Sequence, residues 1–504
     1  MSTGPLLGLE LDRDGPLGLQ IERQVRELVR SGALEVGQAL PSSRTLAADL
    51  RVSRGVVVGA YTQLAAEGYI AVRRGAAPTV AAAASAPVQV ENDPNLPFAR
   101  ATCLPDFALF PRAQWLTVVR SSLQDAAGED FAYGEPQGAS DLRRRLPAFL
   151  ARTRGVVGTT DRTCIFAGSS QALFVLASVL RARGATRIAV EDPSHRWRAT
   201  TLAASGLELV PVRVDEGGLC VDELPDVPAV VVSPEHQFPT GAALAPERRR
   251  ALLNWAAGGE RIVIEHDYDG HFRYDRAPPA ALQGLAPERV AYVGSASALL
   301  APTVRVGWAV LPGALVAPVV EYLFATSIAA PRLTQLALSE FLERGFLDRH
   351  LRKVGAVYRR RREALVTSLA RHVPEARVVG SAAGLFLSLS FPADTDEPAL
   401  LRAAREQGIG LDGFNEHAAT PQPPGAALGF ACESEPVLRY GARLLGLSGD
   451  AGRRGTQASP PSPFEPVGSV TAWPRSASRP DVGHSTGVDF SSGGNDVGGD
   501  PDQE

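Results

Sequence analysis

The sequence has 504 residues, which is too long for one compact core, so two or more domains are expected. It is 45% hydrophobic and 21% charged with a formal net charge of −4, a soluble globular composition that gives no global reason for nucleic-acid or membrane binding. No stretch resembles a signal peptide or a membrane-spanning run of about eighteen apolar residues, so we expect a cytoplasmic protein with no membrane partner. The cysteines are far apart and lack the spacing of metal ligands, which predicts buried free thiols and no metal site: Cys103, Cys164, Cys220 and Cys432.

Composition divides the chain into five parts. Residues 1–14 form a short tail, and residues 15–80 carry dense helical periodicity. Residues 81–97 are rich in Ala and Pro without periodicity, which indicates a linker. Residues 98–447 alternate short apolar runs with longer amphipathic stretches, a pattern typical of an α/β domain with a largely parallel sheet. Residues 448–504 are rich in Gly, Ser, Pro and Asp, so we expect a disordered tail.

Residues 15–80 predict three short helices and a wing. The stretch "LGLQIERQVRELVRSGAL" has apolar residues at helical spacing, and "LPSSRTLAADL" follows with serines suited to an N-cap. Ser53 begins the third helix, and "AVRRGAAPTV" indicates two short strands with Gly75 at the bend. Residues 16–80 hold eight Arg against five Asp and Glu, a local net charge of +3 (8 − 5) that suits a phosphate-facing module. On this pattern alone, a DNA-binding winged helix-turn-helix and a small helical interaction domain remain equally good interpretations.

The residues of this segment decide between the two interpretations. "GALEVGQALPSSRTLAADLRVSRGVVVGAYTQLAAEGYI" closely resembles the GntR family of bacterial regulators, which implies a winged helix-turn-helix that binds a double-stranded DNA operator. The resemblance implies that Arg44 and Arg54, at the starts of the second and third helices, contact DNA. A helix N-terminus favours phosphate, and an arginine there can form two hydrogen bonds with a guanine edge. Ser43 and Ser53 either donate to phosphates or only cap their helices, and both roles stay open.

Two positions depart from the GntR pattern. Val56 stands where the family usually carries Thr, which removes one phosphate donor. The wing reads Gly75-Ala76-Ala77 in place of Gly-x-Gly, which weakens the expectation of a minor-groove contact at this position.

Seven motifs follow one another in residues 98–447: "LPDFALFPRAQW", "YGEPQGASDLRRRLPAFLARTRGV", "IFAGSSQALFVLASVL", "AVEDPSH", "SPEHQFPTGAAL", "IEHDYDGHFRY" and "YVGSASALLAPTVRVGWAVLP". This set resembles the aminotransferase-like domain of MocR-type regulators, in which a GntR reader precedes a fold type I domain of the pyridoxal-phosphate-dependent class. With the reader, the resemblance covers nearly the whole chain except the tails. It implies an α/β fold, a homodimer and a pyridoxal-phosphate site.

Such a site needs a phosphate cradle, a partner for each part of the ring, and a lysine that forms the Schiff base. Residues 168–171 precede an apolar helix, so their amides would face an anion at a helix N-terminus. Arg305 matches the family's phosphate-binding arginine, and its alternative role is a surface ion pair. The alternative role of the cradle serines is to stabilise turns. The residues that match cofactor-binding positions are Gly168, Ser169, Ser170, Gln171, His195, His236, Gln237, His266, Tyr268, Ser295, Ser297 and Arg305.

The ring end of the site departs further from the family. The segment "HQFPTG" matches the family's segment over the exocyclic oxygen, with His236 or Gln237 as donor and Tyr268 near the same oxygen. The family's stacking tyrosine is replaced by His195, with Trp197 close by in the sequence.

The two residues most needed for catalysis are replaced. His266 stands where the family usually has the aspartate that holds the pyridinium proton, and a neutral imidazole cannot stabilise a protonated ring as a carboxylate does. Ala298 stands at the lysine of the Ser-Lys motif and cannot form an imine. The chain has a single lysine, Lys353, in an arginine-rich helical stretch, where we expect it to be solvated.

Two functions from different classes are consistent with these residues. The first is a DNA-binding transcriptional regulator whose degenerate aminotransferase-like domain forms a homodimer and senses a small molecule without covalent capture. Four alternatives stay open for the ligand of this domain: pyridoxal phosphate, its aldimine, another phosphate, or no ligand at all. The second is a working aminotransferase with a vestigial DNA-binding module. The absence of a lysine at position 298 favours the first, and "PGAALGFA" lacks the arginine that would hold a substrate carboxylate in active relatives.

Overall fold

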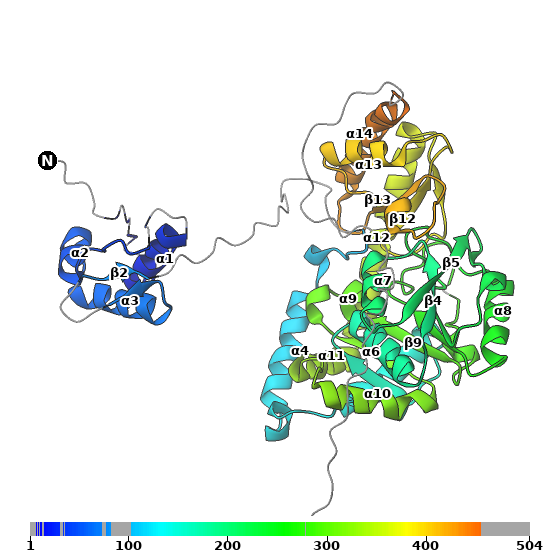
Figure 1. The fold of residues 1–504 in the computed structure, drawn as a ribbon, viewed down its shortest axis with the longest axis horizontal. Coiled ribbons are helices and arrows are strands. Elements are labelled where there is room, and N and C mark those ends of the chain that lie inside the picture. The colour runs from blue at the N-terminus through cyan, green and yellow to red at the C-terminus, as the bar shows by residue number, and fades with distance from the viewer. Residues whose placement is uncertain are drawn as a thin grey trace, which may run out of the picture. The chain divides into compact units, whose positions relative to one another are not determined.

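The chain divides into two compact units, Met1–Pro94 and Asn95–Glu504 (Figure 1). The computed structural model describes Leu7, Leu9 and residues 11–12, 15–30, 34, 36–72, 77–81, 102–277 and 279–454. Most of the predicted linker and the tail from residue 455 onward lie outside the described residues. No helix in the part of the chain that is described is long and apolar enough to cross a membrane.

The small unit has three helices followed by two short antiparallel strands, as the sequence predicted. Its core joins apolar residues of all three helices, among them Ile21, Leu46 and Leu64, each fully buried. The wing strands pair Ile70 with Val80, and the predicted bend at Gly75 lies outside the described residues. The elements are α1 (Leu17–Arg30), α2 (Ser43–Leu50), α3 (Arg54–Ala66), β1 (Ile70–Ala71) and β2 (Thr79–Val80).

The large unit is built on an eight-stranded sheet with the order β3-β10-β9-β8-β7-β4-β5-β6. Strands β4, β5, β7, β8 and β9 pair in parallel, whereas β3, β6 and β10 join antiparallel. The predicted α/β architecture with a largely parallel sheet is therefore confirmed. The strands are β3 (Thr163–Phe166), β4 (Arg187–Asp192), β5 (Glu208–Asp215), β6 (Gly218–Leu219), β7 (Ala229–Val232), β8 (Ile262–His266), β9 (Val290–Ser295) and β10 (Gly307–Val310).

Both faces of the sheet are buried because successive strand residues point to opposite sides. In β7 and β8, Val231 and Ile264 pack with α6 (Ser169–Ala182) and α10 (Gly313–Thr326), while Val230 and Val263 pack with α8 (Pro246–Ala257). The strands consequently read as continuous apolar runs rather than as alternating ones. The other helices before α12 are α4 (Arg112–Asp125), α5 (Ser140–Arg154), α7 (Arg196–Ala203), α9 (Ala296–Leu299) and α11 (Arg332–Glu343).

A second, four-stranded antiparallel sheet with the order β11-β12-β14-β13 follows the long helix α12. Helix α14 extends to Arg454, past the predicted domain end at Leu447, because a helix that has already formed gains one backbone hydrogen bond for each residue added. The elements are α12 (Phe346–His372), β11 (Arg377–Val379), β12 (Phe386–Ser390), α13 (Glu397–Glu406), β13 (Asp412–Gly413), β14 (Gly425–Gly429) and α14 (Glu435–Arg454).

Candidate functional site

The N-termini of α2 and α3 carry the predicted DNA-contacting residues. Ser42 caps α2, since its hydroxyl accepts from the backbone of Thr45 at 3.2 Å, and Ser43 is the first helical residue. Ser53 begins α3 without any side-chain capping hydrogen bond, so its hydroxyl does not serve as the cap. Arg54 is exposed, and its Nε donates to the hydroxyl of Ser43 at 3.5 Å.

These contacts place the two helix starts side by side. Arg44 is also exposed, so two guanidiniums lie in solvent at adjoining helix N-termini. Helix N-termini and arginines both attract phosphate. The predicted contacts of Ser43, Arg44, Ser53 and Arg54 with DNA stay predictions, and two exposed guanidiniums at helix N-termini are what a phosphate-facing surface requires.

In the large unit, the predicted phosphate cradle lies at the N-terminus of α6. Gly168 caps this helix with φ of 115°, and a Cβ atom there would lie 3.6 Å from Nη1 of Arg305. The exposed Arg305 adopts a left-handed backbone (φ 50°) and has no ion pair within the described residues. Gly307 packs so closely that a Cβ would lie 2.9 Å from the backbone nitrogen of Ser169. A guanidinium and the start of a fourteen-residue helix therefore meet, a suitable arrangement for an anion.

The remaining cradle residues differ in availability. The hydroxyl of Ser295 accepts from the backbone of Ser297 at 3.3 Å and caps α9, whereas Ser170 is exposed. The side chain of Gln171 is engaged at both ends, because it accepts from the backbone of Ala167 at 2.5 Å and donates to the carbonyl of Ile328 at 2.8 Å. Gln171 therefore stabilises the shape of the cradle, and its side chain is not available to contact an anion.

His266 ends β8 inside the fold with 2% exposure. Neither of its ring nitrogens has a hydrogen-bond partner in the described part of the chain. Burial, with help from the positive charge of Arg198, lowers the pKa of His266 to about 3. The imidazole is neutral near pH 7, with one nitrogen able to donate and the other able to accept.

Asp267, the residue next to His266, already accepts hydrogen bonds from other residues. Asp267 accepts from Nε of Arg154 at 2.6 Å and from the hydroxyl of Tyr292 at 2.8 Å through the same oxygen. Its other oxygen accepts from the backbone of Gly270. Burial acts to raise the pKa of Asp267, but Arg154 overcomes it and holds the pKa below its usual value. Asp267 is thus a structural anion and leaves His266 as the polar group of β8 without a partner.

His195 stacks on Phe238 with ring centroids 3.5 Å apart and planes 1° apart. Its Nε2 lies 3.4 Å from the thiol of Cys103, and Trp197 lies 5.8 Å away, tilted. Burial lowers the pKa of His195 well below its usual value and raises that of Cys103 well above its own, so the contact joins neutral groups. His195 therefore belongs to an aromatic cluster and has one face covered by a phenyl ring.

The predicted donors over the ring oxygen are also largely engaged. His236 Nδ1 pairs with Asp269 at 2.9 Å, and its Nε2 is buried with no partner among the described residues. Gln237 donates to the carbonyls of Pro193 and Phe238 and accepts from Thr240, so its amide fixes the loop. The hydroxyl of Tyr268 donates to the carbonyl of His236 at 2.6 Å.

Ala298 lies in α9, between the predicted cradle serines and Arg305 in sequence. It is 6% exposed and packs in the main apolar core beside Leu299 and Leu300. Lys353 is exposed on α12, as the sequence predicted. The four cysteines are free as predicted, although Cys103 and Cys432 are only half-buried.

Two residues of the aromatic cluster around His195 were not predicted from the sequence. Phe238 lies in the "HQFPTG" motif, which by itself assigns no role to its ring. His417 lies 222 positions after His195, yet the two ring centroids are 6.1 Å apart. Helical or strand periodicity carries no signal for such contacts. The only hint was the clustering of scarce aromatic residues in consecutive motifs.

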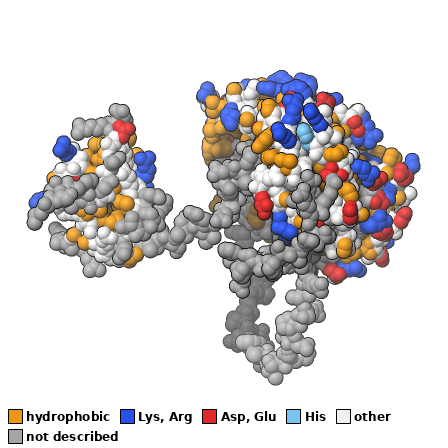
Figure 2. Space-filling model, turned by 90° about the horizontal axis from the view of Figure 1, so that it is seen from above, with side chains coloured by type: hydrophobic (Ala, Val, Ile, Leu, Met, Phe, Trp, Pro, Cys, Tyr) orange, Lys and Arg blue, Asp and Glu red, His pale blue; other side chains and the backbone are white. Residues whose placement is uncertain are grey.

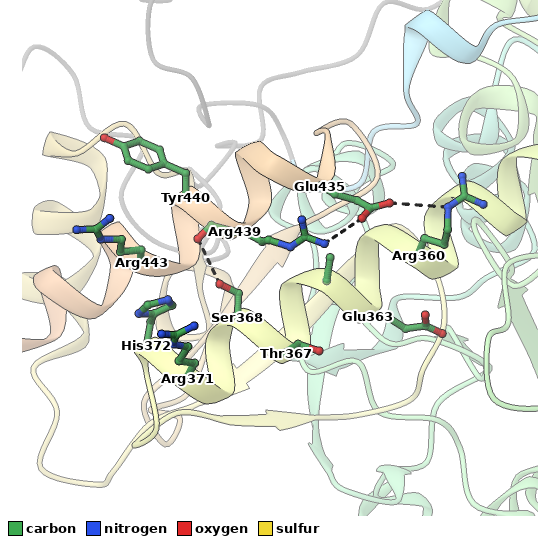
Figure 3. Close-up of a pocket in the computed structure, with 11 residues that line it drawn as sticks. Arg360, Glu363, Thr367, Ser368, Arg371, His372, Glu435, Arg439, Tyr440 and Arg443 are labelled. Carbon is green, nitrogen blue, oxygen red and sulfur yellow. Dashed lines mark hydrogen bonds and ion pairs between the residues drawn. The ribbon is translucent and has the colours of Figure 1, made fainter.

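Basic side chains gather on the face of the large unit shown in Figure 2. One groove of about 730 Å³ separates α12 from α14, and Figure 3 shows its arginines lining both helices. Arg439 and Arg360 both pair with Glu435, whereas Arg371 and Arg443, which also line the groove, form no ion pair with any described carboxylate. None of the predicted cofactor-binding residues lies here.

Comparisons with known proteins agree with both units. Residues 17–80 match the family described as bacterial regulatory proteins, gntR family, and residues 109–422 match aminotransferase class I and II. The chain is 30% identical over 433 residues to the HTH-type pyridoxine biosynthesis transcriptional regulator PdxR of Corynebacterium glutamicum, covering 84% of this chain and 93% of PdxR. It is 28% identical over 473 residues to the probable rhizopine catabolism regulatory protein MocR of Rhizobium meliloti, covering 87% and 95%.

The fold of the large unit is that of solved aminotransferases. Pyrococcus horikoshii kynurenine aminotransferase superposes with a TM-score of 0.65 at 22% identity, covering 72% of this chain and 92% of that one. At this identity the similarity establishes the fold and leaves the activity open. With a GntR domain ahead of a class I and II aminotransferase domain, and with regulators as full-length relatives, the chain belongs to the GntR family of HTH-type transcriptional regulators, in its MocR-type form.

Proposed function

We propose that this regulator binds an operator through α2 and α3 and senses a phosphate-bearing small molecule, pyridoxal phosphate in the first instance, by reversible non-covalent binding. The proposal that the protein binds a phosphate rests on the closeness of Arg305 to Gly168 at the start of α6. A Cβ atom at Gly168 would lie 3.6 Å from Nη1 of Arg305. Ala298, in the turn between the strand end and this arginine, has no amine to offer. The relative PdxR is named for pyridoxine biosynthesis, which supports a vitamin B6 compound as effector.

The residues fit the phosphate and the ring of pyridoxal phosphate but not its covalent attachment. Arg305, the hydroxyl of Ser169 and the α6 N-terminus would hold the phosphate. The unpartnered nitrogens of neutral His266 suit a hydrogen bond to an unprotonated pyridine nitrogen, since the nearby Asp267 is bound to Arg154. Bound pyridoxal phosphate would supply an aldehyde and an electron-accepting ring, while Ala298, at the position of the family's lysine, would supply no amine for an imine.

The role of the chain's own residues is then to bind and orient. Arg305 supplies charge, His195 and Trp197 supply aromatic surface, and Tyr268 is fixed by its hydrogen bond to the carbonyl of His236. Such a ligand controls a regulator only through a difference in affinity between two of its states. A homodimer suits this role because a palindromic operator needs two readers.

A titration of purified protein with pyridoxal phosphate, followed by borohydride and dialysis, tests the proposal. We expect the absorbance of the free aldehyde, a saturable fluorescence change, and complete loss of the chromophore on dialysis. Arg305→Gln should weaken binding about tenfold or more, the scale of one charge-assisted phosphate contact. A chromophore that borohydride fixes to the wild type and that survives dialysis would contradict non-covalent binding. Equal affinity of wild type and Arg305→Gln would contradict the cradle.

A further inference from the structure

A pocket of about 700 Å³ separates the large sheet's loops from the four-stranded sheet, apart from the predicted cofactor residues. One wall comes from the end of β5, the loop at residues 240–243 and the segment after β8. The other comes from α12, β11, β12 and the segment at residues 414–424. The lining residues on which the inference rests are Thr240, Arg273, Asp275, Arg362, Arg377 and Phe414.

The arginines of this pocket outnumber the carboxylates available to them. Arg273 is 4% exposed at its side chain and forms a double ion pair with Asp275, Nε–Oδ1 at 2.5 Å and Nη2–Oδ2 at 3.0 Å. Its Nη1 is buried without a partner in the described chain. Arg362 and Arg377 have no ion pair with any described carboxylate, and Nε of Arg362 is likewise buried without a partner.

The other acidic residues of the lining do not balance them. Asp215 is bound by Arg248 through both oxygens, at 2.5 and 2.7 Å, so its charge is already matched. Glu216 is exposed to solvent at the end of the pocket formed by β5. Burial lowers the pKa of Arg362 most, and Arg273 lowers it further, against the opposing effects of Tyr274, Asp275 and Glu363. Of the carboxylates that the described lining holds, Asp275 pairs with Arg273 and none pairs with Arg362, so an added anion would reduce the repulsion between these two guanidiniums.

The rest of the lining is apolar with a few hydroxyls. Val378, Phe414, Pro423 and Pro424 form apolar surface beside the arginines, and Ser381 adds a hydroxyl. Ligand pockets of this kind combine apolar walls with a small number of charged groups that orient the ligand. A mineral anion would leave the apolar wall unused. We propose that this pocket binds a small organic carboxylate, with its carboxylate at Arg362 and Arg377 and its apolar part against Phe414.

The pocket adjoins the loop that carries the predicted ring contacts. Thr240 lines the pocket and its hydroxyl donates to the side chain of Gln237 at 2.6 Å. The backbone nitrogen of Ser381 donates to the carbonyl of Gly241 at 2.7 Å, and a Cβ at Gly380 would lie 2.5 Å from the carbonyl carbon of Gly241. A ligand that bridges these walls fixes the four-stranded sheet against the "HQFPTG" loop. Its regulatory effect rests on the proposed function, whereas its binding does not.

Thermal unfolding of the full chain in sodium succinate or sodium benzoate, against sodium chloride at equal ionic strength, tests this site. We expect at least one carboxylate to raise the Tm of the wild type by about 2 °C or more at a tenfold excess over Kd. The rise should disappear in Arg362→Gln and in Arg377→Gln, and Arg377 is exposed, so its variant should fold. Arg371→Gln, on the α12–α14 groove of Figure 3, should keep the full rise and is the matched control.

Three results would overturn the proposal. These are no rise with either carboxylate, an equal rise in all variants, or a rise with inorganic phosphate alone. Arg305→Gln separates this site from the cradle: its carboxylate response should equal that of the wild type, even if its pyridoxal-phosphate binding is lost. A carboxylate response that vanishes in Arg305→Gln and survives in Arg362→Gln would assign the anion to the cradle instead.

Discussion

Arg154 and Asp267 form an ion pair in the centre of the large unit, with Nε 2.6 Å from Oδ2 and side-chain exposures of 0% and 1%. The pair joins the last turn of α5 to the segment that follows β8, 113 positions along the chain. Because Asp267 is next to His266, this pair explains why the carboxylate nearest the replaced aspartate is not free to take its place.

Breaking this pair should be costly. Asp267→Asn leaves the buried guanidinium of Arg154 with Glu235, which lies 3.9 Å away and is already paired with Arg249 at 2.9 Å. We expect the free energy of unfolding to fall by about 3–5 kcal/mol. Urea unfolding followed by circular dichroism measures the change. The control is Asp141→Asn, which removes an exposed ion pair with Arg144 and should change stability little. Equal stabilities of the two variants would show that the buried pair has no such role.

Stability should fall as the pH falls below neutrality. Burial holds the pKa of His266 at about 3 and that of His271 at about 4, below the ordinary value of about 6.5. Between these values the unfolded chain binds protons that the folded chain does not, so the free energy of unfolding decreases towards acid by up to about 1.4 kcal/mol per pH unit for each histidine. Urea unfolding at pH 7, 6 and 5 gives the free energy of unfolding at each pH. This free energy should change less per pH unit in His266→Gln than in His372→Gln. Identical slopes would contradict the buried neutral imidazole.

DNA recognition should depend on Arg54 more than on a comparable arginine elsewhere in the small unit. Arg54→Ala should lose about 1–3 kcal/mol of discrimination between operator and random duplex, the worth of one bidentate base contact. Arg23 is exposed on α1, and Arg23→Ala should keep the discrimination even if overall affinity drops slightly. Fluorescence anisotropy at several salt concentrations separates the two effects. If Arg54→Ala discriminates as well as the wild type, Arg54 does not contact bases.

The large unit should form a homodimer through an apolar surface. Phe131, Tyr133, Phe324 and Ile328 are each more than half exposed, and Tyr133 and Phe324 line one groove of about 720 Å³. Exposed apolar residues gathered in this way are typical of an interface. Light scattering at micromolar concentration should give the dimer mass for the wild type and the monomer mass for Phe324→Arg. Leu447→Arg, at an equally apolar exposed position on α14, should stay dimeric. A monomeric wild type would refute the prediction.

Deletion of residues 455–504 should leave folding and dimerisation intact. This segment is rich in Gly, Ser, Pro and Asp and has few apolar residues to bury. The Tm of the shortened chain should match that of the full chain within a few degrees. A larger drop would show that the segment packs on the folded units.

The sequence by itself determined the order of the two units, the reader helices and the largely parallel sheet. It also determined that position 298 has no amine. These features depend on residues that are close in sequence. The spacing of apolar residues predicts each helix, capping residues predict where it starts, and short motifs identify the turns. The Ser42 cap of α2 follows from such local rules, as do the positions of Val263 and Ile264 on opposite faces of β8.

Only the tertiary structure decided which polar groups are free. Gln171, Gln237 and Asp267 matched or adjoined cofactor positions in sequence, yet each is occupied by a partner in the fold, while the ring nitrogens of His266 have none among the described residues. The stacking of Phe238 on His195 and the position of Arg362 near Arg273 are decided in the same way. The physical reason is that a hydrogen bond or ring contact depends on which segments pack together. Partners more than a hundred positions apart leave no trace in local periodicity.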